Sequence, residues 1–170
     1  MHHDVRIRNI SDADWPGVAA LEAGVYTDSS LSEGQTALES RGRASPTTCF
    51  VLEFGDRIAG YVLALPYPMF RFPDLTRPEV VVFQSRNLHL HDLVIAESLR
   101  GRGLGRRLLR HLTSTARAAE YERMSLIAVG GMETFWAANG YRAHREVRLP
   151  LSYGSTAVYM STTVRTGPNQ

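Results

Sequence analysis

The stretch HLHDLVIAESLRGRGLG, residues 89–105, decides the fold, because it leads from a strand through a glycine-rich turn into a helix. The apolar run in 88–95 predicts the strand. Beyond the turn, apolar residues recur at every fourth position and predict the buried stripe of a helix from about 103 to 119: Leu104, Leu108, Leu112 and Ala116. This order of elements is typical of an α/β domain.

The turn has the composition of an anion-binding site. Its glycines alternate with other residues, and arginines surround them: Gly101, Gly103 and Gly105 with Arg100, Arg102, Arg106 and Arg107. Free N–H groups and the helix dipole favour an anion at a helix start, and glycine lets the backbone approach a ligand closely. We therefore expect the turn to hold a pyrophosphate; the alternative is a tight turn with solvated arginines.

Two other nucleotide-binding motifs do not fit the sequence. The glycine spacing is G-x-G-x-G, whereas a dinucleotide-binding Rossmann turn has G-x-G-x-x-G. All 19 basic residues are arginine, so a P-loop that ends in Lys-Ser/Thr is excluded.

The composition is that of one globular domain. The 170 residues are 44% hydrophobic and 21% charged, and the net charge of +2 gives no reason to expect nucleic acid or membrane as a partner. The lone Cys49 rules out an internal disulfide or a cysteine metal cluster and is interpreted as a buried apolar residue. We find no membrane span or signal peptide and expect a cytoplasmic protein.

Hydrophobic patterning predicts strands at 4–10, 48–54, 57–65, 88–95, 124–129, 145–151 and 157–164. It predicts helices at about 16–26, 32–41 (capped by Ser32), 103–119 and 134–139, and a long connection at 66–86. The expected unit is a single α/β domain over residues 4–165, with flexible termini at 1–3 and 166–170.

The motifs of the chain resemble those of a known family. Arg100, Gly103 and Gly105 have the R-x-x-G-x-G spacing of motif A of the GNAT (GCN5-related) N-acetyltransferases. The segment FWAANGY at 135–141 is similar to that family's F-[YW]-x-x-x-G-[FY] segment. The strand HLHDLVI at 89–95 and the pair Gly130-Gly131 resemble bacterial relatives of the arylalkylamine N-acetyltransferases.

This resemblance implies a single-domain GNAT fold, in which helices flank a mixed central β-sheet and two strands splay apart at the acyl-CoA site. It implies acetyl-CoA as the acyl donor, a small-molecule amine as the acceptor, no metal, no nucleic acid or membrane partner, and a monomer or homodimer. The backbone of Leu93, Val94 and Ile95 would pair with the pantetheine arm. The pyrophosphate would lie on Arg100, Gly101, Arg102, Gly103, Leu104, Gly105 and Arg106.

Amine attack on a thioester needs a base, and histidine titrates near working pH. His89 and His91 are two apart on a strand and are expected on one face, with Asp92 on the other. The resemblance assigns proton removal to His91 first and His89 second; the alternative is a polar strand face. Trp136 stands where animal relatives have a tyrosine that is proposed as the general acid. Either the CoA thiolate leaves without a proton donor, or Tyr141 or another group serves.

The acceptor is expected to enter over residues 26–43 and 66–86. Aromatic and acidic side chains there suit an ammonium, whereas Arg71, Arg77 and Arg86 suit an acidic acceptor, so both remain open. The alternative functions are an acyl-CoA-binding module without catalysis, or an acyltransferase that uses a carrier-bound or peptide partner.

Overall fold

A computed structural model describes residues 4–26 and 31–164, so the predicted flexible termini lie outside the described residues. Seven strands form one sheet in the order β1-β2-β3-β4-β5-β7-β6. They are β1 (Val5–Asn9), β2 (Phe50–Phe54), β3 (Arg57–Pro66), β4 (Asn87–Ile95), β5 (Arg123–Ala128), β6 (Arg142–His144) and β7 (Val158–Thr163). The β4–β5 pair is parallel and the other pairs are antiparallel. The predicted mixed α/β fold is confirmed.

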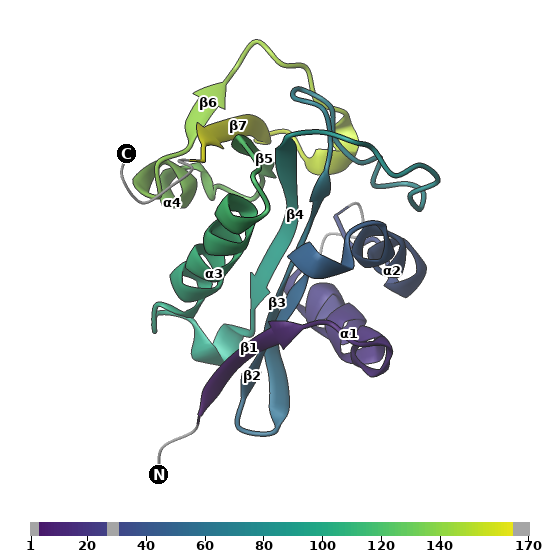
Figure 1. The fold of residues 1–170 in the computed structure, drawn as a ribbon, viewed down its shortest axis with the longest axis vertical. Coiled ribbons are helices and arrows are strands. Elements are labelled where there is room, and N and C mark those ends of the chain that lie inside the picture. The colour runs from purple at the N-terminus through teal and green to yellow at the C-terminus, as the bar shows by residue number, and fades with distance from the viewer. Residues whose placement is uncertain (1–3, 27–30, 165–170) are drawn as a thin grey trace.

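The helices cover both faces of the sheet (Figure 1). Helices α1 (Trp15–Val25) and α2 (Gln35–Ala44) lie on one face, and α3 (Leu104–Ala118) and α4 (Glu133–Ala138) lie on the other. Short 3₁₀ turns are η1 (Asp12–Asp14), η2 (Pro46–Thr48), η3 (Glu97–Leu99) and η4 (Leu151–Tyr153). The predicted α3 stripe is buried in the larger hydrophobic core, and Trp15, Val18 and Leu38 anchor the second core.

The central strands open a wedge in the sheet. Strands β4 and β5 pair only from Asn87–Arg123 to Leu90–Leu126, although β4 continues to Ile95. The register against β3 shifts at the same place, since Ala64 pairs with Leu90 and Leu63 with Asp92. His91 is the unpaired residue of this β-bulge, which bends β4 away from β5. The expected splayed strand pair is confirmed.

Two predicted boundaries are wrong. The closing strand is Arg142–His144, and residues 145–150 form turns and irregular backbone before η4. Pro150, which has no N–H for a ladder, lies at the end of this stretch. The second helix begins at Gln35: Gly34 has a φ of 86°, which ends the preceding turn. Ser32 does not cap this helix, because its hydroxyl donates to Glu22.

The long connection at 66–86 is confirmed, since residues 67–86 contain no helix or strand. It packs beside η4 and α2 (Figure 1). No helix in 4–26 or 31–164 is long and apolar enough to cross a membrane.

Candidate active site

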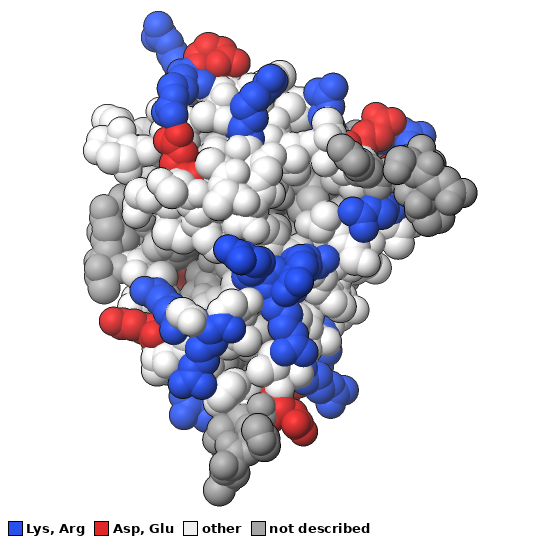
Figure 2. All heavy atoms as spheres, turned by 90° about the vertical axis from the view of Figure 1, so that its left-hand side faces the viewer, with Lys and Arg blue, Asp and Glu red and all other residues white. Residues whose placement is uncertain are grey.

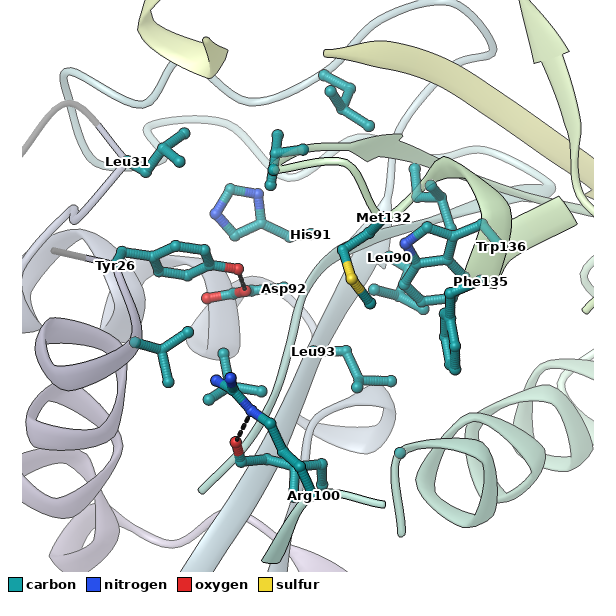
Figure 3. A pocket seen from close by; sticks show the side chains of 18 of the residues that line it. Tyr26, Leu31, Leu90, His91, Asp92, Leu93, Arg100, Met132, Phe135 and Trp136 are labelled. Atoms are coloured by element: carbon teal, nitrogen blue, oxygen red, sulfur yellow. Dashed lines mark hydrogen bonds between the residues drawn. The ribbon is translucent and has the colours of Figure 1, made fainter. Parts of the chain in front are cut away.

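A cavity of about 880 Å³ lies where β4 and β5 separate, and it is lined from both sides of the wedge. One half is formed by residues around the glycine turn, the end of β4 and α4, including Leu93, Gly103 and Trp136. The other half is bounded by Tyr26 at the end of α1 and by Leu31 in the segment before α2 (Figure 3). Leu75 also lines this half. We call these the donor half and the acceptor half.

The glycine turn in the donor half has the geometry of an anion cradle. Gly101 and Gly103 have φ values of 82° and 75°, in the left-handed region that glycine adopts most readily. Gly103 is the N-cap of α3, and no side-chain hydrogen bond caps that helix start. A Cβ at either glycine would meet no protein atom within 4 Å, so the space above the turn is open to a ligand.

The predicted donor-binding residues mostly meet at this cavity. Those that line it are Leu93, Val94, Ile95, Arg100, Gly101, Gly103, Leu104, Gly105 and Arg106. Arg102 does not line it, and its guanidinium lies 5.8 Å from the ring centroid of Phe54. Arginine side chains gather around a hollow on this face of the molecule (Figure 2), as a polyphosphate ligand requires.

His91 lines the acceptor half and has one ring nitrogen without a hydrogen-bond partner among the described residues. Its Nε2 lies 2.5 Å from Oε2 of Glu33, and its buried Nδ1 has no hydrogen-bond partner in the described part of the chain. Burial works to raise the pKa of Glu33, but the facing His91 and Arg41 outweigh it and hold this pKa below its ordinary value. When the imidazole is neutral and its proton lies on Nε2, facing the Glu33 carboxylate, the ring lone pair lies on Nδ1.

Asp92 shares the acceptor half with His91, so the expectation that it points away is wrong. The bulge interrupts the alternation of β4, because it inserts His91 without a partner. Asp92 accepts hydrogen bonds from Tyr26 at 2.7 Å and from Tyr61 at 2.6 Å. Burial raises the pKa of Asp92 to about 6 despite the nearby His91 and these two donors.

His89 occupies a different environment from His91. It is 1% exposed, does not line the cavity, and has Nδ1 2.8 Å from the hydroxyl of Ser125. Its ring lies against those of Tyr67 and Tyr159. Burial lowers the pKa of His89 to about 3, with His91 and Arg41 adding to the effect. His89 therefore packs among aromatic rings and does not reach the cavity.

Neither Trp136 nor Tyr141 is suited to act as a general acid on a thioester in the cavity. Trp136 lines the cavity and packs edge-on against Phe135 and Tyr141. Tyr141 does not line the cavity; its hydroxyl contacts the sulfur of Met124, and burial raises its pKa. Tyr141 is thus a core residue and cannot reach a thioester in the cavity.

The arginines that suggested an acidic acceptor are engaged elsewhere. Arg71 lies 4.9 Å from the Phe83 ring centroid, Arg77 pairs with Asp74, and Arg86 lies 4.0 Å from Glu122. None of the three lines the cavity. The acceptor half instead presents two carboxylates, Glu33 and Asp92, among apolar and tyrosine side chains.

Comparisons with known proteins agree with this geometry. Residues 6–137 match the model of the Acetyltransferase (GNAT) family. The chain belongs to the GNAT acetyltransferase family. Membership of this family makes it an acyltransferase. No curated protein sequence matches the chain.

Solved structures share the GNAT fold over nearly the whole chain. Ard1 from Thermoplasma volcanium has a TM-score of 0.75 at 17% identity, with 95% of this chain and 98% of that chain covered. The loading GNATL domain of CurA from Lyngbya majuscula has a TM-score of 0.76 at 16% identity, with the coverages 95% and 98%. PaiA N-acetyltransferase from Thermoplasma acidophilum, solved with coenzyme A, has a TM-score of 0.68 at 11% identity, with 94% of this chain and 99% of that chain covered. These identities establish a common fold.

The sequence alone did not single out Glu33, Asp92 and Tyr26 as a group. Glu33 reaches His91 across a separation of 58 residues, and Tyr26 reaches Asp92 across 66. Such contacts depend on how α1 and the segment before α2 pack on β4. A carboxylate near the first helices was visible in the sequence, but nothing local marked which one would face the histidine.

Proposed function

We propose that this protein is an N-acetyltransferase that transfers acetyl from acetyl-CoA to the primary amine of a small molecule, with His91 as the base. One observation carries the proposal: a single cavity joins the glycine turn to an acceptor half where the buried Nδ1 of His91 lacks a partner. The resemblance of strand β4 to arylalkylamine N-acetyltransferases adds support for an amine with an aromatic or alkyl body.

His91 performs the proton transfer in this scheme. An alkylammonium must lose a proton before its nitrogen can attack, and Nδ1 takes that proton directly or through one water. The amine nitrogen then bonds to the thioester carbonyl carbon, the C–S bond breaks, and CoA leaves as the thiolate. The nitrogen releases its second proton as the amide forms, and the thiolate takes up this proton directly or through water. Glu33, hydrogen-bonded to Nε2, holds the imidazole orientation and stabilises the imidazolium.

The departing thiolate needs no tyrosine in this chain. Tyr26 and Tyr153 line the cavity, but Tyr26 donates to Asp92 and Tyr153 donates to the carbonyl of Pro73. A thiol with a pKa of about 8.5 is a tolerable leaving group without an acid. We therefore assign Trp136 to packing along the donor arm.

The acceptor class follows from the charges of the acceptor half. Glu33 and Asp92 favour a cation, while Val25, Leu31 and Leu75 favour an apolar body. A carboxylate beside the reacting amine would face both acids, because the arginines that line the described cavity, Arg100 and Arg106, belong to the donor half. We expect phenethylamine to be acetylated with a kcat/KM at least about tenfold above that of phenylalanine, which differs by one carboxylate.

Calorimetry with acetyl-CoA, followed by thiol release with a panel of amines, polyamines and peptides, tests the proposal. Acetyl-CoA binding and turnover on a small amine are expected. Failure to bind acetyl-CoA would reject the proposal outright. Binding without turnover on any acceptor would favour an acyl-CoA-binding module, and turnover on peptides alone would favour a macromolecular acceptor.

A further inference from the structure

A buried arginine lies behind the histidine, outside the cavity wall. Arg41 belongs to the last turn of α2, and its side chain is 1% exposed. Its guanidinium contacts Oε1 of Glu33 at 2.6 Å, Oε1 of Glu79 at 2.7 Å, and the carbonyl oxygens of Asp74 and Arg77 at 2.7 and 3.0 Å. An arginine so enclosed is ordered by partners on several sides.

Glu33 connects this arginine to the histidine. Its Oε1 accepts from Arg41, and its Oε2 lies against Nε2 of His91. The two oxygens of one carboxylate therefore face two cationic or potentially cationic groups. Because Glu33 is shared, the charge on Arg41 changes how strongly the carboxylate can stabilise an imidazolium.

The same guanidinium also holds the wall of the acceptor half. The segment 74–79 approaches α2 through its carbonyls and Glu79, and the backbone N–H of Glu79 donates to the Ser40 hydroxyl. Tyr67 donates to Glu79 from the start of the same connection. Leu75, which lines the cavity, lies within this segment.

We propose that Arg41 is a positioning residue for acyl transfer: it fixes segment 74–79 as the acceptor wall, and through the shared Glu33 carboxylate its charge limits how strongly Glu33 stabilises the His91 imidazolium. The proposal rests on the proposed function of His91 as the base. Arg41 touches neither the cavity nor the reacting atoms, so it acts through Glu33. Glu79 balances part of the guanidinium charge. Removing the Glu79 charge should therefore change the electrostatic potential at His91 in the direction opposite to removing Arg41.

Several charged or titratable groups face His91, and their charges affect how readily its imidazole takes up a proton. From the segment before α2 comes Glu33, and from α2 itself comes Arg41; β4 contributes Asp92 and His89, and the cavity walls contribute Tyr26 and Tyr153. Among these groups Arg41 carries a positive charge at every working pH. Its loss should ease proton uptake by His91, and loss of the Glu79 charge should hinder it.

The test compares Arg41→Gln, Glu79→Gln and the control Arg43→Gln. Arg43 lies on the same helix, is 65% exposed, and pairs with Glu39. Titration of the His91 imidazole by NMR in the ligand-free protein gives a readout that needs no activity. We expect the midpoint to rise by on the order of one pH unit in Arg41→Gln, to fall in Glu79→Gln, and to stay unchanged in Arg43→Gln.

Kinetics complete the test. The acid limb of the kcat/KM profile should follow the NMR midpoints: it should move to higher pH in Arg41→Gln and to lower pH in Glu79→Gln. Shifts of the same sign in both variants, or no shift in either, would overturn the proposal, since a purely structural role predicts lower activity without opposite shifts. If Arg41→Gln does not fold, the Glu79→Gln midpoint decides alone. Opposite NMR shifts in a protein without transferase activity would reject the proposed function while retaining the network.

Discussion

Replacing Asp92 by asparagine should stabilise the protein at neutral pH and leave it little changed in acid. Asp92 is 6% exposed, and its carboxylate accepts hydrogen bonds from the hydroxyls of Tyr26 and Tyr61. Burial nevertheless raises its pKa from 3.8 to about 6, and the nearby His91 opposes that rise only in part. The folded protein therefore holds this proton more tightly than the unfolded chain does.

The sign and size of the effect follow from that difference. Between pH 4 and 6 the folded state binds more protons than the unfolded state, so the free energy of unfolding falls as pH rises. A displacement from 3.8 to about 6 corresponds to about 3 kcal/mol once the pH exceeds 6. Asparagine has no proton to lose and escapes this penalty. For a domain of this size, about 3 kcal/mol corresponds to roughly 6–12 °C in Tm.

Thermal melts of the wild type and Asp92→Asn from pH 4 to 8 measure this difference. The variant should gain Tm relative to the wild type as pH rises and level off above pH 6. The control Asp56→Asn, in the exposed hairpin turn between β2 and β3, should run parallel to the wild type. If Asp92→Asn also ran parallel to the wild type, Asp92 would not be a buried carboxylate with a raised pKa.

Three further results are expected. Glu33→Gln should lower kcat by about 10- to 100-fold with unchanged acetyl-CoA affinity in calorimetry, because a neutral amide stabilises the imidazolium of His91 less well; an unchanged kcat would remove Glu33 from the mechanism. Gly103→Ala should lower the free energy of unfolding by about 1 kcal/mol in thermal melts, because Gly103 has a φ of 75°. Gly105→Ala should keep or slightly raise Tm, because a Cβ there meets only ordinary contacts at 3.7 Å. Equal losses of Tm in the two variants would contradict this. NMR titration should find His89 still neutral at pH 4.5, and a midpoint near 6 would show that its site is hydrated.

Local patterning was sufficient for most of the fold. The four-residue spacing of leucines identified α3, and the glycine turn before it was predicted as a ligand cradle, because both depend on neighbouring residues. The boundaries that failed depended on single residues: Gly34 turns the chain before α2, and Pro150 accompanies the loss of the expected strand at 145–151. Hydrophobic periodicity carries no information about single positions of this kind.

The acceptor half was less accessible to sequence reasoning. A strand pattern assumes strict alternation, and the bulge at His91 brings Asp92 into the cavity. The partner of His91 comes from a segment that is distant in sequence, and so does the arginine behind it. His89 and His91 look equivalent in the sequence, yet one is enclosed by aromatic rings and the other faces Glu33.

The central claim is that His91 removes the proton from an amine acceptor in this cavity. The most direct test is the pH dependence of kcat/KM for acetyl-CoA-dependent thiol release with phenethylamine, in the wild type and in His91→Ala. We predict a loss of about 10²- to 10⁴-fold in the variant and a flat profile between about pH 6 and 8. A variant that keeps the wild-type profile would contradict the assignment of His91 as the base.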